Sequence, residues 1–275
     1  MTWLDELAAT GRLLKSAPRA FPNSSWTMTR VLEERAIQAP DDLAIAYLDR
    51  QYTWKEIDRD SNRWAHVFLD EGIQPGDIVA LIMDNRPEYL FAVHGLAKIG
   101  AAAALINTNL TGNPLAHAIT VGNSRKVVAG DEHAAAVEEV LAELDTLDDE
   151  RPVLLHVEET TQPRPGGGVP LNEAVQKARP SKPQVVFDAD SDSLFCYIYT
   201  SGTTGLPKAA VISHRRAMVG GLGAAHLMMR LKQGDVSYVA LPLYHSSAMF
   251  VGWSAVLNSG AAMALRRKFS VTHFW

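Results

Sequence analysis

The residues best suited to chemistry lie in one stretch, YTSGTTGLPKAAVI, which runs from Tyr199 to Ile212. Positions 200 to 205 are all Ser, Thr or Gly, and Lys208 follows shortly after them. Glycine leaves the backbone open to a ligand, and successive backbone amides in such a loop can converge on an anion. Hydroxyl groups and one ammonium group add further donors. This composition predicts a loop that binds phosphate.

The spacing of this loop differs from that of the commonest phosphate loop, G-x-x-x-x-G-K-[ST]. Gly202 and Gly205 are three residues apart, and Lys208 has no Ser or Thr after it. The flanking runs at 194–199 and 209–212 are strand-like, so we expect a hairpin with no helix behind the loop. Loop amides, hydroxyl groups and the lysine would then bind the anion. The alternative is an ordinary hairpin turn with a solvated lysine.

A second group of candidates follows the run LPLY. His245 comes at the end of an expected strand, where a lone histidine is generally a hydrogen-bonded structural residue. Met249, Phe250 and Trp253 form an apolar stripe that either lines a ligand tunnel or packs in the core. The residue types alone leave a binding and a structural interpretation open for all four.

Three polar residues, Asp84, Asn85 and Arg86, come directly after the apolar run at 78–83. Ligands bind near the carboxyl ends of parallel strands, so these side chains could contact one. Capping of the next helix explains them equally well.

The elements that must position these groups alternate regularly from Thr53 onward. Thr53 and Glu56 match a capping box, and apolar residues then recur at helical spacing until Gly72. The run IVALIM at 78–83 is wholly apolar and is bounded by turn residues, which predicts a strand buried on both faces.

The same alternation continues to residue 157. Pro87 opens a helix that Gly100 closes. Further strands are expected at 102–106, 126–129 and 153–157, and further helices at 113–122 and 132–144. This rhythm predicts an α/β fold with doubly wound, mostly parallel sheets.

We expect two subdomains, an α/β unit over 53–213 that ends with the phosphate loop and the start of a second sheet unit over 214–275. The segment 159–184 is rich in Pro and Gly, which predicts a surface excursion without strands. The acidic helix at 132–144 has an Ala/Val/Leu face, so we expect a solvated outer helix and no acidic site.

Composition excludes several classes of protein. The 275 residues are 47% hydrophobic, enough for a large core, and one cysteine, Cys196, excludes an internal disulfide framework. No Cys/His cluster has metal-ligand spacing, and no apolar stretch is long enough to span a membrane. The start of the chain is a poor signal peptide, so the cytoplasm is the expected location. An N-terminal helix either lies on a membrane surface as a peripheral contact or docks on the protein.

Charge is distributed unevenly along the chain. The net charge is −5, yet residues 208–275 hold 8 basic residues and 1 acidic residue. These basic residues occur singly or in short clusters, without interleaved aromatic residues or a nucleic-acid-binding module. We therefore expect anionic small molecules, or an acidic partner surface, and no nucleic acid. The sequence assigns no oligomeric state.

The motif YTSGTTGLPK resembles the signature loop of the AMP-forming adenylating superfamily, which includes acyl-CoA synthetases, peptide-synthetase adenylation domains and luciferases. The region from Tyr52 to Asn107 is similar to the N-terminal α/β region of that superfamily, and LPLYHSSAM is similar to its substrate-site strand and turn. The resemblance runs from about Trp26 to Trp275. Ala209 after the motif lysine, LPLYHS and the terminal RRKFSVTHFW resemble the very-long-chain acyl-CoA synthetase and fatty-acid transport protein group.

This resemblance implies ATP-dependent activation of a long or very-long-chain fatty acid, first to acyl-AMP and then to acyl-CoA. It implies ATP, Mg²⁺ and CoA as cofactor and co-substrates, with Thr200 near the metal and Lys208 as a catalytic cation. His245 would lie near the substrate carboxylate in a catalytic or positioning role, and Met249, Phe250 and Trp253 would line the acyl tunnel. The implied ATP-binding residues are Thr200, Ser201, Gly202, Thr203, Thr204, Gly205, Leu206, Pro207 and Lys208.

Members of the superfamily are considerably longer than this chain. The resemblance therefore implies an incomplete N-terminal adenylation domain that lacks the C-terminal domain and is inactive alone. Residues after about 214 are expected to lack their sheet partners. Two other functions stay open at this point, adenylation of an aryl or amino acid and a non-catalytic fragment that binds nucleotide.

Overall fold

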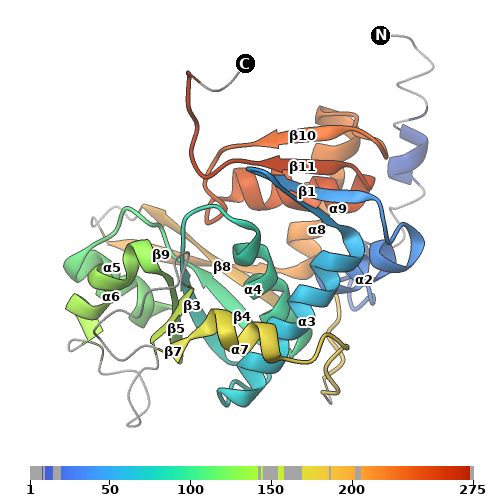
Figure 1. Ribbon diagram of the computed structural model, residues 1–275. Coiled ribbons are helices and arrows are strands. Elements are labelled where there is room, and N and C mark those ends of the chain that lie inside the picture. Colours follow the sequence, from blue (N-terminus) through green and yellow to red (C-terminus); the bar gives the residue numbers. More distant parts are fainter. Residues whose placement is uncertain are drawn as a thin grey trace.

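A computed structural model describes residues 8, 10–14, 20–141, 144, 154–157, 169–185, 187–201 and 206–272 (Figure 1). Two sheets organise these residues. The larger sheet has the order β7 (Val169–Pro170), β6 (Leu154–Val157), β5 (Lys126–Gly130), β3 (Ile78–Ile82), β4 (Ala102–Leu105), β8 (Leu194–Ser201) and β9 (Pro207–Ser213). The smaller sheet has the order β10 (Val236–Val239), β11 (Ala262–Leu265), β1 (Leu43–Tyr47) and β2 (Arg50–Thr53).

Helices cover both faces of the larger sheet, which confirms the doubly wound α/β fold. Alternate residues of β3 face opposite sides, because side chains in a strand alternate. Val79 and Leu81 join a core with α3 (Trp54–Asp70), α4 (Pro87–Lys98) and α7 (Leu171–Lys177). Ile78, Ala80 and Ile82 join a core with α5 (Gly112–Val121) and α6 (Ala134–Leu141). Figure 1 shows these two helix groups on the two sides of the sheet.

Strand pairing in the larger sheet is parallel except at one edge. The pairs β3–β4, β3–β5, β4–β8, β5–β6 and β6–β7 are all parallel, whereas β8 and β9 form an antiparallel hairpin. The carboxyl ends of β3, β4, β5 and β8 therefore lie at one edge of the sheet, where ligands of such folds usually bind.

Local signals in the sequence form as expected. The Thr53 side chain accepts from the Glu56 amide, and the Glu56 carboxylate accepts from the Thr53 amide, so the capping box is present. Pro87 occupies the first turn of α4, and Gly100 follows the end of that helix with a φ of +78°. A side chain at Gly100 would also meet the Phe187 ring at 2.5 Å, so glycine is required there.

A buried ion-pair cluster joins the first helices. The Lys98 ammonium group on α4 contacts Glu33 at 3.1 Å and Asp58 at 2.7 Å, and its side chain is 1% exposed. Glu33 lies on α2 (Met28–Gln38) and Asp58 on α3. One buried cation thus fixes three helices to one another.

The smaller sheet corrects one expectation. Residues after 214 were expected to lack sheet partners, but β11 pairs in parallel with both β10 and β1. Ile45 lies opposite Met263, so a strand that precedes Thr53 in the chain pairs with the strands of residues 236–265. The boundary between 213 and 214 itself stays a prediction.

The segment 159–184 corrects a second expectation, since its described part holds structure. Strand β7 pairs with β6, and α7 follows at once with Leu171 buried. Prolines and glycines nearby concealed this short strand and helix in the sequence.

The last quarter of the chain contains two π-helical stretches. Helix α8 (His214–Gly223) continues into η3 (Ala224–Met228), and η4 (Ser247–Ser254) continues into α9 (Ala255–Ser259). Helices α8 and η4 pack closely at Gly221. A side chain added at this glycine would clash with the Ser254 hydroxyl. A 3₁₀ turn, η2 (Asp131–His133), precedes α6. Within the described residues, none of the helices has the length and apolar character that crossing a bilayer requires.

Candidate functional site

The described residues of the predicted phosphate loop, at 200–201 and 206–208, lie at the end of the β8–β9 pair of strands, and the flanking runs are strands as predicted. Thr200 lies opposite Lys208 and Ser201 opposite Pro207 in the antiparallel register. Thr200 and Lys208 are both exposed, whereas Pro207 is buried and Leu206 half-buried. The remaining predicted loop residues, Gly202, Thr203, Thr204 and Gly205, lie outside the described residues.

Helix α5 contacts both strands of this hairpin close to its turn. The Tyr199 hydroxyl donates to the Ala118 carbonyl at 2.7 Å, and the ring nitrogen Nε2 of His117 lies 3.2 Å from the Pro207 carbonyl. Burial raises the pKa of Tyr199, so its hydroxyl stays a donor at all physiological pH values. Gly122, which follows the end of the helix, lies close to this hydroxyl. A side chain added at Gly122 would meet the Tyr199 hydroxyl at 2.5 Å. The helix therefore holds the backbone that immediately precedes Thr200 and Lys208.

His245 lies on the other sheet, in the turn between β10 and η4. Its ring is exposed, and Nδ1 lies 2.9 Å from the Ser247 hydroxyl. Its backbone amide donates to the Pro242 carbonyl, and its own carbonyl accepts from the Ala248 and Met249 amides, which begin η4. The imidazole is thus fixed at the start of a helix and open to solvent, while the described contacts keep it within its own turn.

The apolar stripe of η4 divides into core and partly exposed residues. Met249 and Trp253 are fully buried, whereas Phe250 is half-buried. The Trp253 indole donates to His94 at 2.8 Å and packs against Trp54 with ring centroids 5.8 Å apart. These contacts give Met249 and Trp253 a structural place in the core.

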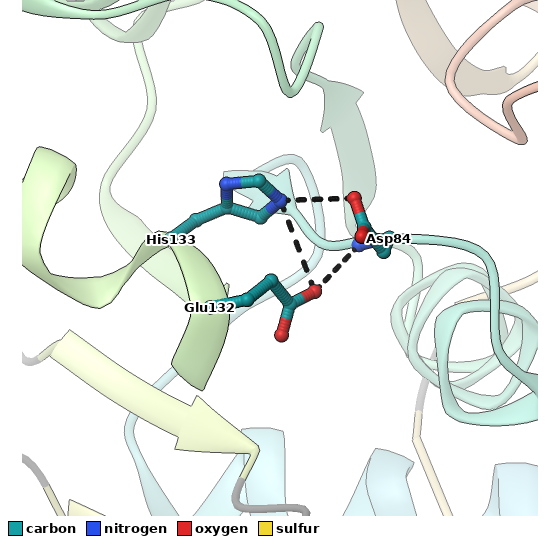
Figure 2. A group of neighbouring side chains, drawn as sticks. All are labelled: Asp84, Glu132 and His133. Carbon is teal, nitrogen blue, oxygen red and sulfur yellow. Dashed lines mark hydrogen bonds and ion pairs between the residues drawn. The ribbon is translucent and has the colours of Figure 1, made fainter. Parts of the chain in front are cut away.

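Asp84 and Arg86 belong to an ion-pair network and do not cap α4, since Arg86 at the N-cap makes no side-chain capping bond. Asp84 accepts from His133 at 3.1 Å and from Arg267 at 3.1 Å. The Arg86 guanidinium pairs with Glu132, whose carboxylate also accepts from the Asp84 amide at 2.8 Å. Figure 2 shows Asp84, Glu132 and His133 pointing toward one another.

The composition of this cluster suits a divalent cation, but its charge balance does not. One ligand atom each from Asp84, Glu132 and His133 lies within 4.8 Å of the others. The carboxylates are already neutralised, because Arg86 pairs with Glu132 while Arg267 and Lys268 contact Asp84 at 3.1 and 3.4 Å. A divalent ion would add charge to a balanced group, so the network is structural.

The pKa values in the network follow from these contacts. Burial alone would raise the pKa of Asp84, but hydrogen bonds from His133 and Arg267 outweigh it and keep that pKa below its usual value. Burial would likewise raise the pKa of Glu132, but the Asp84 amide and Arg86 keep it low. Both carboxylates are therefore charged near neutral pH. No local sequence pattern predicts this network, because residues 84, 132 and 267 are far apart in the chain.

Comparison with known proteins places this geometry in a family. Residues 32–275 match the family of AMP-binding enzymes. The chain belongs to this family. Thr200 and Lys208, which the sequence predicts as phosphate contacts, lie opposite each other in its β8–β9 hairpin.

Relatives of this chain include fatty-acid ligases and transport proteins. The medium/long-chain-fatty-acid–CoA ligase FadD6 of Mycobacterium tuberculosis is 33% identical over 261 residues, covering 93% of this chain and 40% of that protein. Human long-chain fatty acid transport protein 6 is 38% identical over 237 residues, covering 84% of this chain and 36% of that protein. The chain thus spans about two fifths of the length of these relatives.

A solved structure has the same fold. The inhibitor-bound N-terminal domain of FACL13 from Mycobacterium tuberculosis superimposes with a TM-score of 0.78 at 26% identity. The superposition covers 90% of this chain and 59% of that domain. It agrees with the α/β architecture derived from the sequence.

A cavity that sequence reasoning missed lies between β1, β2 and helices α3, α4 and α7. Its volume is about 680 Å³, and aromatic rings and arginines line it. Burial, followed by the Glu88 carboxylate, raises the pKa of Tyr52 in its wall to about 12. Each arginine in the wall is paired with a carboxylate, in the pairs Arg50–Glu88, Arg63–Asp60, Arg86–Glu132 and Arg267–Asp84. The arginines in the wall of this cavity are therefore engaged in ion pairs before any ligand binds.

Proposed function

We propose that this chain supplies the phosphate-binding hairpin and part of the acyl site of a fatty-acid–CoA ligase. The proposed reaction joins a long or very-long-chain fatty acid to AMP with release of pyrophosphate, and then transfers the acyl group to CoA. The observation that carries the proposal is the hairpin, in which Thr200 and Lys208 lie opposite each other and are both exposed to solvent. The names of the fatty-acid ligase and transport-protein relatives support the choice of substrate.

The proposed chemistry requires charge neutralisation more than proton transfer. A fatty-acid carboxylate with a pKa of ~4 to 5, by analogy with Asp and Glu, is already ionised at neutral pH. It attacks the α-phosphorus of ATP. Because the carboxylate and the phosphates are both negatively charged and repel each other, hydrogen-bond donors and cations on the phosphates lower the barrier. Lys208 supplies the cation, and the hydroxyl of Thr200 can bind the Mg²⁺ that accompanies the phosphates, since Mg²⁺ prefers oxygen ligands.

The second half of the proposal concerns the acid. His245 orients the carboxylate, because its exposed ring is fixed at the start of η4 by the hydrogen bond to Ser247. Phe250, which is half-buried on the same helix, lines the acyl tunnel, with Met249 and Trp253 behind it. The CoA thiol then attacks the acyl carbonyl and AMP leaves. We place this reaction in the cytoplasm, or at a membrane surface facing it.

The decisive experiment is carboxylate-dependent exchange of pyrophosphate into ATP by the whole protein that contains this chain. Lys208→Ala is expected to lower exchange by about 30-fold to 1000-fold, the effect of losing one charged contact in the transition state. Thr203→Val, which removes a hydroxyl group and keeps volume, tests the loop donors, and Thr108→Val outside the motif is its matched control. If both loop variants exchange like the unsubstituted protein, the loop is a plain hairpin and the proposal fails.

The choice of carboxylate is tested with the same assay. Palmitate, benzoate and a mixture of amino acids are compared as the acid that supports exchange. Exchange with benzoate or amino acids and none with palmitate would replace the fatty acid with another carboxylate. MgATP binding without exchange for any acid would favour a non-catalytic nucleotide-binding role.

A further inference from the structure

Asn85 follows the carboxyl end of β3 and contacts two segments of the smaller sheet. Its side chain is buried, with 3% of the residue exposed. Its Nδ2 donates to the Leu241 carbonyl at 2.8 Å and to the Arg266 carbonyl at 3.0 Å, and its Oδ1 accepts from the Leu243 amide at 2.7 Å. One side chain of the larger sheet thus holds the chain that leaves β10 and the chain that leaves β11.

These partners fix the orientation of the amide. Two carbonyl oxygens can face only the NH₂ group, and a backbone N–H can face only the oxygen. Both N–H donors of the amide and its oxygen are therefore bonded. All three partners are backbone groups, so substitutions of the side chains at 241, 243 and 266 would leave them in place. A carboxylate, a hydroxyl group or an apolar side chain cannot make the same three bonds.

The base of this contact is held firmly on both sides. Asp84 pairs with Arg267, which follows the Arg266 carbonyl that Asn85 contacts. Arg86 pairs with Glu132 on η2, which follows β5. Because its neighbours are anchored, Asn85 cannot follow the 241–243 segment if that segment shifts, and the hydrogen bonds define one position for it.

The 241–243 segment determines where His245 lies. The His245 amide donates to the Pro242 carbonyl, and the His245 carbonyl accepts from the Ala248 and Met249 amides at the start of η4. The hydrogen bonds therefore run from Asn85 through residues 241–243 to His245 and the first turn of η4. A second contact from the larger sheet, Asn109 to the Tyr244 hydroxyl at 3.3 Å, is longer and exposed.

We propose that Asn85 is a positioning residue for the carboxylate of the acyl substrate, acting through the turn that carries His245. This inference rests on the proposed function, because it assigns His245 to the carboxylate. Asn85 does not touch the reacting atoms. It sets the distance from the acid-binding turn on the smaller sheet to the phosphate hairpin on the larger one.

The sharpest perturbation is Asn85→Asp, which keeps size and shape. It retains an acceptor for the Leu243 amide and replaces both donors with an oxygen that faces two carbonyls. The control is Asn62→Asp, since Asn62 is also buried and its Nδ2 donates to the Pro180 carbonyl at 3.1 Å and to the Asp58 carboxylate at 3.3 Å, away from this turn. If Asn85→Asp does not fold, Asn85→Ser takes its place, because a hydroxyl group is too short to contact both carbonyls.

The first measurement is hydrogen–deuterium exchange on the 275-residue chain, which needs no catalysis. The Ala248 and Met249 amides are expected to exchange about tenfold faster or more in Asn85→Asp, on the scale of an unpaired buried polar group. The imidazole resonances of His245 are expected to shift in the same variant, while those of the distant His66 stay in place. Asn62→Asp is expected to change neither the exchange rate of the Ala248 and Met249 amides nor the imidazole resonances of His245.

The second measurement is steady-state pyrophosphate exchange by the whole protein. The KM for fatty acid is expected to rise about tenfold in Asn85→Asp, with the KM for MgATP within about twofold of the original, a split that general destabilisation would not produce. Unchanged exchange of the Ala248 and Met249 amides would overturn the inference, as would an unchanged fatty-acid KM in a variant whose turn is loosened. Failure of the proposed function is distinct, since it would show as no fatty-acid-dependent exchange in the unsubstituted protein.

Discussion

Two buried histidines should make the folded chain sensitive to mild acid. His94 is fully buried and accepts a hydrogen bond from Trp253, and burial, with nearby Lys98, lowers its pKa to about 3. His214 is 1% exposed, its Nδ1 accepts from the Met28 amide at 3.1 Å, and burial lowers its pKa to about 4. Both rings are therefore neutral in the folded chain at every pH above about 5.

The direction and size of the effect follow from linkage. In the unfolded chain both histidines titrate near pH ~6.5, so the unfolded state binds more protons between that pH and the lowered pKa values. Their stabilising contribution is complete above pH ~6.5 and is lost as the pH falls below it. At ~1.36 kcal/mol per pH unit, the fall from 6.5 to 5 costs ~2 kcal/mol for each ring and ~4 kcal/mol for the pair. The total free energy of unfolding of a typical domain is only ~5 to 15 kcal/mol.

The carboxylates do not obscure this window. The pKa values of Glu33, Asp84 and Glu132 lie below their usual range, so their stabilising contribution is lost only at more acidic pH. Burial also lowers the pKa of His226, which adds to the slope in the same direction.

The assay is urea unfolding at pH 7 and pH 5, followed by tryptophan fluorescence and circular dichroism. The double variant His94→Gln, His214→Asn keeps an acceptor at each site and removes both titrating rings. It is expected to lose less than half as much free energy of unfolding between the two pH values as the original chain. His66→Gln, at a half-buried ring whose Nε2 lies 2.9 Å from the Ser181 carbonyl, is the control and should keep the full loss. Equal losses in the double variant and the original chain would refute the assignment to these two rings.

Two further predictions concern contacts described above. Lys98→Met leaves two carboxylates facing each other without their buried cation, so the free energy of unfolding should fall by ~3 to 5 kcal/mol in urea titrations. Lys177→Met, at an exposed ion pair, should have no measurable effect, and equal losses would contradict the role of burial. Tyr199→Phe should cost ~1 to 3 kcal/mol and speed exchange of the Leu206 and Lys208 amides, because it leaves a carbonyl of α5 unpaired. Tyr197→Phe, on the same face of β8, should do neither, and similar behaviour of the two variants would exclude the contact with α5.

The parts of the fold that the sequence predicts are those built from local patterns. The capping box at Thr53 and Glu56, the buried strand at 78–83 and the β8–β9 hairpin each depend on residues close together in the chain. Their signals are caps, periodicity and turn residues, which act over a few positions. The structure confirms all three for this reason.

Strand partners that are distant in the chain left no comparable signal. Ile45 pairs with Met263, although more than two hundred residues separate them in the chain. Strand β11 is a run of four apolar residues, and nothing in such a run specifies which strand it pairs with. The sequence therefore assigned residues 236–265 to a sheet without its β1 partner. The short strand β7 was missed because two residues have no periodicity to read.

The candidate site shows the same division. The loop motif identified Thr200 and Lys208, and the hairpin places them opposite each other. Residues 132 and 133 were expected to begin a solvated helix, but Glu132 and His133 belong to a network with Asp84. Such a network depends on which strand ends are neighbours in the sheet, and this is a property of the topology that no local pattern encodes.

The two groups proposed to act on the substrates come from different sheets, so their separation depends on the contacts between the sheets. Lys208 belongs to the hairpin of the larger sheet, and His245 follows β10 of the smaller one. In-line attack of a carboxylate on phosphorus tolerates little misalignment, and a shift of ~1 Å can cost ~100-fold in rate. Under the proposed function, the contacts at 84–86 help to set this alignment although none of them touches a substrate. This accounts for polar residues at the carboxyl end of β3, where the sequence left ligand binding and helix capping as the only explanations.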